Sequence, residues 1–346
     1  MSGPGTIDVA VVGASSLIGG AVIAELRTSK FPYARIHRLE ELRDIGRIEA
    51  DDDDEAQPAL DVEQFDFSTV QVAFFCSRAQ VSRTHAPAAA AHTWVIDGSG
   101  AFRDAVDSPL IAADVNPQSL EGTVVGQARR GLIVMPGSAS VALATALAPL
   151  HRLAGLSRVE VATYHCVSGS GRAALEELAR ECAALLNGQE PKVRGGGERI
   201  AFNVIPQVDT LDESGASLEE LRLQSDARRL LGLPSLAVNA TAVRVPVFFG
   251  HGLAIHATFD RDIPLEQARE TLRTAPGVQL VEAESSPPYP TPAGKSTAPD
   301  RVTIGRLRRD STRPGSLNMW VVADNVRKCA AINAVSVAHI LVNRYC

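Results

Sequence analysis

A short β-branched run near the start of the chain leads directly into a glycine-containing turn and then into a helical pattern of apolar residues. Residues 7–12 predict a buried strand, residues 13–20 the turn, and the pattern that runs through Leu26 a helix. Strand, turn and helix in this order begin the folds that bind dinucleotides, because one glycine permits the tight turn and another lets the helix pack closely. The feature therefore predicts a doubly wound α/β domain at this end of the chain.

The turn itself is a candidate cofactor site. A helix N-terminus attracts a pyrophosphate because its first backbone N–H groups have no partner within the helix. Ser16 occupies the middle position of a Gly-x-x-Gly-x-x-Gly spacing, so the turn supports the fold more strongly than it supports the ligand. The alternative is a doubly wound domain that binds no nucleotide. The predicted cofactor-binding residues of the turn are Gly13, Ser15, Ser16, Leu17 and Ile18.

A charged loop follows the second predicted strand, residues 34–39, at the place where the adenosine ribose of a cofactor would lie. Arg43 is a candidate partner for the 2′-phosphate of NADP. Glu41 and Asp44 would instead repel that phosphate and accept a hydrogen bond from the 2′-hydroxyl of NAD. The loop therefore favours NAD at least as much as NADP, and the alternative is a solvated charged loop. The acidic run 51–55 is predicted to be a surface loop without a metal.

Two further apolar runs, residues 70–75 and 94–97, predict buried strands separated by an alanine-rich helix over residues 82–91. Strands that alternate with helices predict a parallel sheet. Arg103 lies in the loop after the second of these strands, and ligands of open α/β sheets gather at such carboxyl-terminal strand ends. Arg103 is therefore a candidate anion clamp, and the alternative is an ordinary surface arginine.

A second candidate site lies where the apolar run 132–135 breaks at Pro136 and Gly137 and a helix of small residues begins. Ser138 stands at this break. A hydroxyl there is a candidate nucleophile, since the N–H groups of a helix start stabilise developing negative charge. It is also a candidate N-cap, for which serine is a preferred residue, and this stretch alone favours the cap.

Two histidines are candidates for acid–base chemistry. His165 lies in a predicted strand over residues 159–168, and strand alternation predicts that it and Cys166 face opposite sides. His251 lies on a glycine turn after a strand that carries Arg244, which suits an acid or base beside a bound anion. The alternative is a turn histidine without a chemical role.

Composition sets the remaining limits. With 346 residues the chain exceeds what one hydrophobic core usually supports, so two domains are expected. A net charge of −6 argues against a nucleic-acid partner. The chain has no basic leader and no run of about 18 apolar residues, which predicts a cytoplasmic protein without a membrane partner. Five cysteines without paired spacing predict reduced thiols and no bound metal.

Several distinctive blocks are spread over nearly the whole chain. They lie at residues 12–19, 95–103, 163–171, 201–207, 244–251 and 320–328. Together, and in this order, they resemble the aspartate-semialdehyde dehydrogenase family. The resemblance implies an α/β fold with an N-terminal Rossmann-type doubly wound domain, residues 1–134 with 325–346, and an α+β catalytic and dimerisation domain, residues 135–324. It also implies a homodimer and an NADP-dependent reductive dephosphorylation of aspartyl phosphate to the semialdehyde through a cysteine thioester.

The resemblance assigns anion binding to three arginines. Arg103 matches a phosphate-binding arginine, Arg222 stands where the family has a phosphate-binding lysine, and Arg244 matches the arginine that takes the substrate carboxylate. His251 matches the catalytic acid–base residue, and Asn325 matches a cofactor-binding position. The implied partners are therefore a small anionic substrate and a nicotinamide cofactor, NADP or NAD.

The residues of the family's covalent chemistry differ in this chain. Ser138 stands at the position of the nucleophilic cysteine, because residues 135–138 read Met-Pro-Gly-Ser where the family has Asn-Pro-Asn-Cys. His165 replaces the catalytic glutamine, and Leu253 replaces an acidic residue. The nucleophile and its surroundings are thus changed together.

The loop that takes the 2′-phosphate in the family is changed as well, with Glu41 and Asp44 in place of serines. These differences make the chain resemble the non-catalytic, Usg-type paralogues of the family. The expected function is then an anion pocket with weak or no dehydrogenase activity, because a serine hydroxyl needs a stronger base than a thiol does. The alternatives are a functional NAD(P)-dependent dehydrogenase of amino-acid biosynthesis, a changed chemistry such as ester hydrolysis, and a dimeric interaction protein that uses only the fold.

Overall fold

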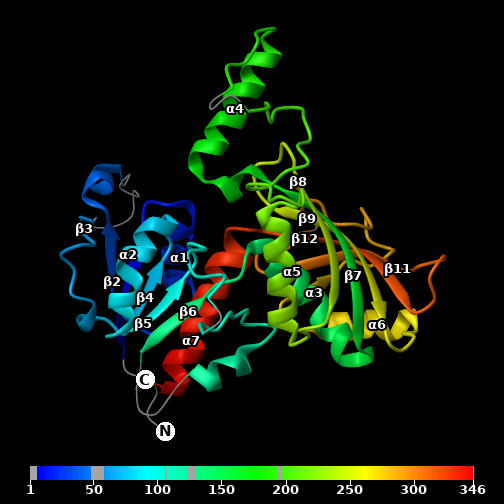
Figure 1. Cartoon of the computed structure of the whole chain (residues 1–346), viewed down its shortest axis with the longest axis horizontal. Coiled ribbons are helices and arrows are strands. Elements are labelled where there is room, and N and C mark those ends of the chain that lie inside the picture. The colour runs from blue at the N-terminus through cyan, green and yellow to red at the C-terminus, as the bar shows by residue number, and fades with distance from the viewer. Residues whose placement is uncertain are drawn as a thin grey trace. The chain divides into compact units, whose positions relative to one another are not determined.

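The computed structural model describes residues 6–47, 58–105, 107–123, 130–193, 197–295 and 297–345. The chain divides into two compact units (Figure 1). Unit 1 comprises Met1–Pro136 and Ala330–Cys346, and unit 2 comprises Gly137–Cys329. Unit 2 is therefore an insertion within the sequence of unit 1. The acidic run 51–55, expected to be a surface loop, lies outside the described residues.

Unit 1 is built around a sheet with the strand order β3-β2-β1-β4-β5-β6. All of its pairings are parallel, as the alternation of apolar runs with helices predicts. The fourth strand is buried along its whole length, which is typical of a sheet covered on both faces. The strands are β1 (Ile7–Val12), β2 (Tyr33–Glu40), β3 (Leu60–Asp61), β4 (Val72–Phe75), β5 (Trp94–Asp97) and β6 (Gly131–Val134).

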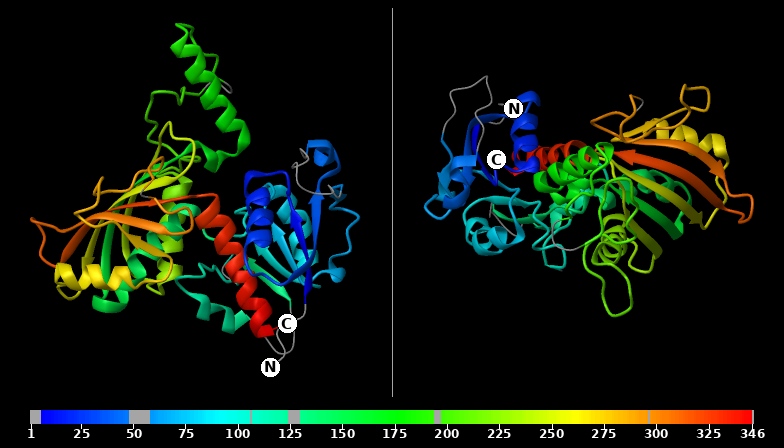
Figure 2. Two further views of the ribbon diagram at one scale, coloured as in Figure 1. Left: turned by 180° about the vertical axis from the view of Figure 1, so that it is seen from behind. Right: turned by 90° about the horizontal axis from the view of Figure 1, so that it is seen from above.

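Helices cover both faces of this sheet (Figure 2). Side chains of α1 (Leu17–Thr28) and α7 (Asn333–Tyr345) pack in one cluster with Val11 of β1. Those of α2 (Ala79–Ala90) pack in a second cluster with Val12. Neighbouring residues of a strand point to opposite faces, so the two clusters lie on the two sides of the sheet. The doubly wound domain predicted from the sequence is confirmed.

Two expected helices have different bounds in the structure. The helix α2 begins at residue 79 rather than 82, after the extended backbone of Arg78. The mostly apolar residues 325–342 predict a final helix, but the regular helix α7 begins at residue 333, after a π-helical turn, η6 (Arg327–Ile332). Asp324 accepts hydrogen bonds from the N–H groups of Val326 and of Arg327, the first residue of this turn, at 2.9 and 2.7 Å. That local turn delays the regular helix to residue 333.

Unit 2 contains a mixed sheet with the strand order β10-β11-β12-β9-β7-β8. The strand β7 runs parallel to β8 and antiparallel to β9, and β9 runs antiparallel to β12. The first residue of β9 and the last residues of β7 and β8 therefore lie at the same end of the sheet. The strands are β7 (Leu156–His165), β8 (Ala237–Arg244), β9 (His251–Phe259), β10 (Val278–Leu280), β11 (Val302–Arg309) and β12 (Ser316–Ala323).

The helix α3 (Ser138–Ala154) is the centre of unit 2. Residues 139–150 are all buried, as expected for a helix that is apolar on every side. The helix contacts β7, β9, β11 and β12, and α5 (Leu218–Leu231) and α6 (Leu265–Arg273) pack on it. Its N-terminus, where Ser138 stands, is fixed by this packing.

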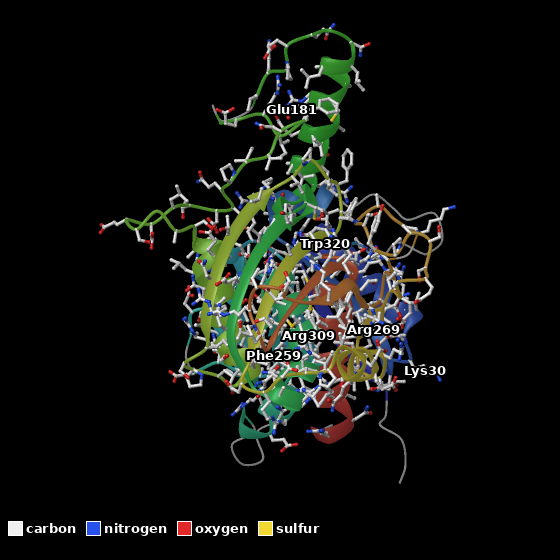
Figure 3. All side chains as sticks on the ribbon, turned by 90° about the vertical axis from the view of Figure 1, so that its right-hand side faces the viewer. Lys30, Glu181, Phe259, Arg269, Arg309 and Trp320 are labelled. Atoms are coloured by element: carbon white, nitrogen blue, oxygen red, sulfur yellow. The ribbon has the colours of Figure 1, made fainter. Side chains whose placement is uncertain are left out.

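The helix α4 (Arg172–Leu186) projects from the sheet of unit 2 (Figure 3). Its Glu181 is buried, and the carboxylate accepts hydrogen bonds from the N–H groups of Ile200 and Ala201 at 3.0 and 2.9 Å. Leu178 packs on the same segment. These contacts hold the segment around Ile200 and Ala201, which follows α4 in the chain, against this helix. In the described part of the chain, no helix has the length and apolar character needed to cross a membrane.

Candidate active site and cofactor site

Ser138 is the first residue of α3 and not its cap. The N-cap is Gly137, whose φ of −60° and ψ of 149° are extended. The hydroxyl Oγ of Ser138 instead lies 2.8 Å from Nε2 of His251. The prediction that Ser138 caps the helix is therefore wrong, because Pro136 and Gly137 carry the turn and leave the serine inside the helix. Ser138 is partly exposed, at a helix start with positive partial charge.

His251 begins β9 and is 2% exposed. The backbone N–H of Cys166 donates to its Nδ1 at 3.2 Å. Burial lowers the pKa of His251 well below its ordinary value, and the neighbouring His165 and Arg244 lower it further. The ring is therefore neutral at pH 7. Since Nδ1 accepts, the single ring proton lies on Nε2, and His251 donates to the oxygen of Ser138.

His165 and Cys166 both lie beside His251. The ring centroids of the two histidines are 4.6 Å apart, and Sγ of Cys166 is 3.3 Å from Nδ1 of His251. The prediction that the two neighbours face opposite sides is wrong. The strand β7 ends at His165, and Cys166 is the first residue of the turn that follows, so strand alternation does not extend to it. Burial raises the pKa of the Cys166 thiol.

Asn325 connects the turns around His251. Its buried side-chain oxygen accepts from the N–H of Gly250 at 3.0 Å and lies 3.1 Å from Oγ of Ser168 and 3.2 Å from Sγ of Cys166. Its amide nitrogen donates to Ser168 at 3.0 Å. The structure thus places this residue, expected to bind cofactor, in a hydrogen-bond network that holds the start of β9. A sequence separation of 75 residues between Asn325 and Gly250 hides this contact from any local pattern.

Two of the predicted arginines lie in unit 2. Arg244 is the last residue of β8 and donates to the carbonyl oxygen of Cys166 at 3.1 Å. It therefore lies next to Cys166, whose backbone N–H donates to His251. Arg222 lies on α5 and pairs with Asp209 at 3.6 Å. The charge of Asp209 also acts on Arg244. The two guanidinium groups therefore share one acidic neighbour.

Arg103, the third predicted arginine, belongs to unit 1. It follows β5 in the chain and is 8% exposed. An arginine with so little exposure is not an ordinary surface side chain, because buried guanidinium groups need partners.

Asp226 is a site residue that the sequence did not reveal. It lies on α5 and is 1% exposed, and its Oδ2 accepts from the backbone N–H of Gly137 at 3.3 Å. A buried carboxylate thus holds the residue before Ser138. The available signal was an acidic residue at an apolar position of a helical pattern, between the buried residues Leu223 and Leu230.

The glycine turn of unit 1 has the geometry of a nucleotide site. Gly13 has a φ of +80°, and a Cβ on it would lie 2.8 Å from the backbone of Ser77. Ser16 caps α1, since its Oγ accepts from the N–H of Gly19 at 2.9 Å. The first-turn N–H groups of Leu17 and Ile18 have no acceptor within the helix. These features fit the pyrophosphate of a dinucleotide.

The charged loop after β2 forms a connected network. Glu40 is 5% exposed, and its Oε1 accepts from the N–H of Ser15 at 2.6 Å. Arg43 pairs with Glu41 at 2.9 Å. Arg78, which the sequence did not single out, binds the carboxylate of Glu41 as well. The loop is therefore more than a solvated run of charges.

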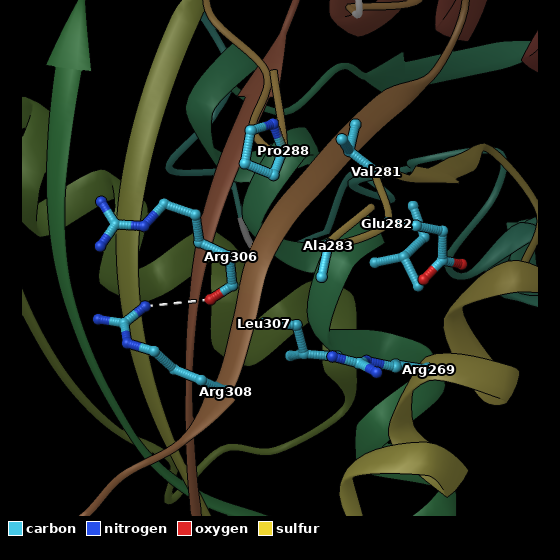
Figure 4. Close-up of a pocket in the computed structure, with 9 residues that line it drawn as sticks. Arg269, Val281, Glu282, Ala283, Pro288, Arg306, Leu307 and Arg308 are labelled. Carbon is cyan, nitrogen blue, oxygen red and sulfur yellow. Dashed lines mark hydrogen bonds between the residues drawn. The ribbon is translucent and has the colours of Figure 1, made fainter. Parts of the chain in front are cut away.

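Unit 2 also contains a pocket (Figure 4). None of its lining residues belongs to the group formed by Ser138, His165, Cys166, His251 and Asn325. Two of its charged side chains form ion pairs nearby, because Arg269 pairs with Glu266 at 2.9 Å and Glu282 pairs with Arg273 at 2.8 Å. Among the described residues, no group of three or more His, Cys, Asp or Glu is arranged to hold a metal ion. The pocket is lined by Arg269, Leu280, Val281, Glu282, Ala283, Pro288, Arg306, Leu307 and Arg308.

Known family models match both parts of the chain. Residues 8–123 match the model described as the semialdehyde dehydrogenase NAD binding domain. Residues 147–328 match the model described as the semialdehyde dehydrogenase dimerisation domain. The first range contains the glycine turn, and the second contains His251 and Arg244.

Individual proteins are similar to this chain over its whole length. An aspartate-semialdehyde dehydrogenase of Shewanella sp. (strain DB6705) is 39% identical over 341 residues, which is 98% of each chain. One of Legionella pneumophila is 37% identical over 336 residues, which is 97% of this chain and 95% of the other. The crystal structure of aspartate semialdehyde dehydrogenase II from Vibrio cholerae has 35% identity and a TM-score of 0.92, with 99% of this chain and 100% of the other covered.

Proposed function

The chain belongs to the aspartate-semialdehyde dehydrogenase family, and we propose that it is a nicotinamide-dependent oxidoreductase of a small anionic semialdehyde. The observation that carries this proposal is the contact between Ser138 and His251 at the start of α3. The names of its full-length relatives also support an active enzyme over a non-catalytic paralogue.

The arginines of unit 2 support a substrate with a carboxylate or phosphate group. An arginine presents a planar set of donors that matches either anion. Arg244 lies against the turn that holds His251, so we assign it the substrate carboxylate. Arg222 is paired with Asp209, and a bound phosphate would compete for it. Arg103 remains a candidate anion ligand of unit 1 by itself, as the family resemblance implies.

We assign to Ser138 the addition to the aldehyde carbon. Its Oγ forms the new C–O bond, the carbonyl electron pair moves to the aldehyde oxygen, and the hydroxyl proton passes to solvent. The Nε2–H of His251 is positioned to donate to the oxygen that becomes negative. A bound nicotinamide ring would supply the acceptor for the hydride of the aldehyde carbon, which would leave an acyl ester on Ser138. A phosphate oxygen would then bond to the acyl carbon, the ester bond to Oγ would break, and Ser138 would regain a proton from solvent. Turnover is slow, because a hydroxyl is a poorer nucleophile at neutral pH than a thiolate.

The proposal includes a homodimer, which the match to a dimerisation domain supports. Sedimentation equilibrium tests it, since one chain has a mass of 36.7 kDa and a dimer has twice that value. A monomer at micromolar concentration would contradict the dimer.

The proposed reaction is tested with the purified full chain, aspartate semialdehyde, phosphate and either NAD or NADP. We expect slow formation of the reduced cofactor, loss of this activity in Ser138→Ala, and a gain of at least about tenfold in Ser138→Cys. The matched control is Ser140→Ala, which removes a buried hydroxyl two positions further along α3. No turnover by the wild type with either cofactor, or equal turnover in Ser138→Ala, would overturn the proposal.

A second candidate function is an anion-binding protein without turnover, as the serine substitution suggests. It is favoured by one observation, namely that His251 donates to Ser138 and does not accept its proton. Calorimetric titration with an aspartate analogue tests this candidate. Binding of the analogue without turnover supports it, and absence of both leaves a dimeric interaction protein.

A further inference from the structure

A buried carboxylate lies against the glycine turn of unit 1. Glu40 is the last residue of β2, and its side chain reaches the N–H of Ser15 at 2.6 Å. With 5% of its surface exposed, Glu40 is enclosed by the same turn that fits a pyrophosphate. In dinucleotide-binding folds the acceptor for the adenosine ribose stands at this strand end. Glu40 is thus placed to accept from a ribose hydroxyl.

Arg43 and Arg78, whose side chains the structure describes near this strand end, are already engaged. The guanidinium of Arg78, at the start of α2, binds the carboxylates of both Glu41 and Asp44, the latter at 3.0 Å. Arg43 binds Glu41 at 2.9 Å and lies 3.9 Å from Asp44. The side chains of Glu41 and Asp44 are 30% and 16% exposed. The side chains of Arg43 and Arg78 are 65% and 55% exposed, so it is the partial burial of the carboxylates that strengthens these interactions relative to a fully exposed pair.

The charges of this network disfavour a 2′-phosphate. Among the side chains that the structure describes in this network, Glu40, Glu41 and Asp44 contribute three carboxylates, and Arg43 and Arg78 contribute two guanidinium groups. A phosphate monoester would add about two negative charges and would have to displace Glu41 or Asp44 from the arginines. A 2′-hydroxyl is a donor, and a carboxylate is its natural acceptor.

We propose that unit 1 selects NAD over NADP, with Glu40 accepting from the adenosine ribose and with Glu41 and Asp44 excluding a 2′-phosphate by holding Arg43 and Arg78. This inference rests on the nicotinamide site of the proposed function. The site itself is supported by the glycine turn and the family match over residues 8–123, and the carboxylates decide only which nucleotide it takes.

The test is calorimetric titration of the full chain with NAD and with NADP, without substrate. We expect the wild type to bind NAD at least about tenfold more tightly than NADP, the ratio that one charge-assisted hydrogen bond provides. The double variant Glu41→Ser with Asp44→Ser frees both arginines and is expected to raise the affinity for NADP by about tenfold or more. Glu40→Gln is expected to weaken the binding of NAD.

The matched control is Glu63→Gln, which removes one negative charge from an exposed residue two positions after the edge strand β3. It should leave both affinities unchanged. Wild-type binding of NADP as tight as that of NAD, binding of neither, or an unchanged NADP affinity in the double variant would each overturn the inference. Binding of NAD without turnover of the semialdehyde supports it and refutes the proposed activity. Turnover of the semialdehyde with NADP but not with NAD would support the proposed activity and refute the selection of NAD.

Discussion

Oγ of Ser138 lies 2.8 Å from Nε2 of His251, although 113 residues separate the two in the sequence. The helix α3 supplies one side chain and the first position of β9 supplies the other. The backbone N–H of Cys166 fixes the proton on Nε2, so His251 acts as a donor in the resting site. A serine that receives this hydrogen bond is not activated, whereas a thiolate in its place would be stabilised.

Ser138→Cys should therefore carry a thiol with a pKa below about 8.5, the ordinary value for cysteine. The helix start and the Nε2–H of His251 both favour the charged form. The rate of alkylation by iodoacetamide as a function of pH, followed by mass spectrometry of the peptide, gives this pKa. In the double variant with His251→Asn the value should rise. A thiol pKa at or above 8.5 in the single variant would show that His251 does not donate to this position.

The stability of unit 2 should depend on pH through His251. Its folded-state pKa is lowered, so below about pH 6.5 the unfolded chain binds a proton that the folded chain does not. This contribution is complete above that pH and is lost, by up to about 1.4 kcal/mol per pH unit, as the pH falls toward the folded-state pKa.

Urea unfolding of the wild type and of His251→Asn between about pH 7.5 and pH 5.5 measures this dependence. The variant should show a smaller loss of stability on acidification. Burial raises the pKa values of Glu40 and Asp97, which act with the opposite sign in both proteins, so the difference between the proteins isolates His251. Equal slopes in the two proteins would mean that His251 is protonated in the folded state.

The fold of unit 1 was predictable because its signals are local. The β-branched run, the glycine turn and the helical pattern lie within residues 7–26, and each element follows from its own composition. The alternation of later apolar runs with helices predicts a parallel sheet, and the structure confirms it. Element ends were less predictable, because the cap at Arg78 and the turn at Asp324 depend on single backbone conformations.

The candidate site was predictable only in part, because its contacts are long-range. Ser138 and His251 were singled out by their turns, but their hydrogen bond depends on the pairing of β7 with β9. The placement of Cys166 was mispredicted, since the sequence does not show that β7 ends at His165 rather than at the predicted residue 168. Asp226 and Gly137 are 89 residues apart, so no local pattern joins them.

Asp226→Ala should loosen the turn that presents Ser138. The change leaves the partly buried N–H of Gly137 without its carboxylate partner, which costs about 1 kcal/mol. Asp226→Asn keeps an oxygen that accepts from this N–H and serves as the matched control. Hydrogen exchange of the peptide containing Gly137 should accelerate in the alanine variant and much less in the asparagine variant. Equal protection in all three proteins would assign the turn's rigidity to its proline and helix packing alone.

Two adjacent glycines of α1 should respond in opposite ways to alanine. A Cβ on Gly19 would lie 2.1 Å from the carbonyl oxygen of Gly13, whereas a Cβ on Gly20 would have nothing within 4 Å. Gly20→Ala should therefore stabilise unit 1 by about 0.5–1 kcal/mol, through helix propensity.

Gly19→Ala should destabilise unit 1 by about 1–3 kcal/mol, because the backbone of the turn must move to admit the methyl group. The same movement would displace the first-turn N–H groups of Leu17 and Ile18 from the pyrophosphate position, so the affinity for NAD should fall with the stability. Thermal unfolding and NAD titration of the two variants provide the comparison. A stabilised Gly19→Ala protein would mean that α1 does not pack as closely on the turn as the distance from Gly13 requires.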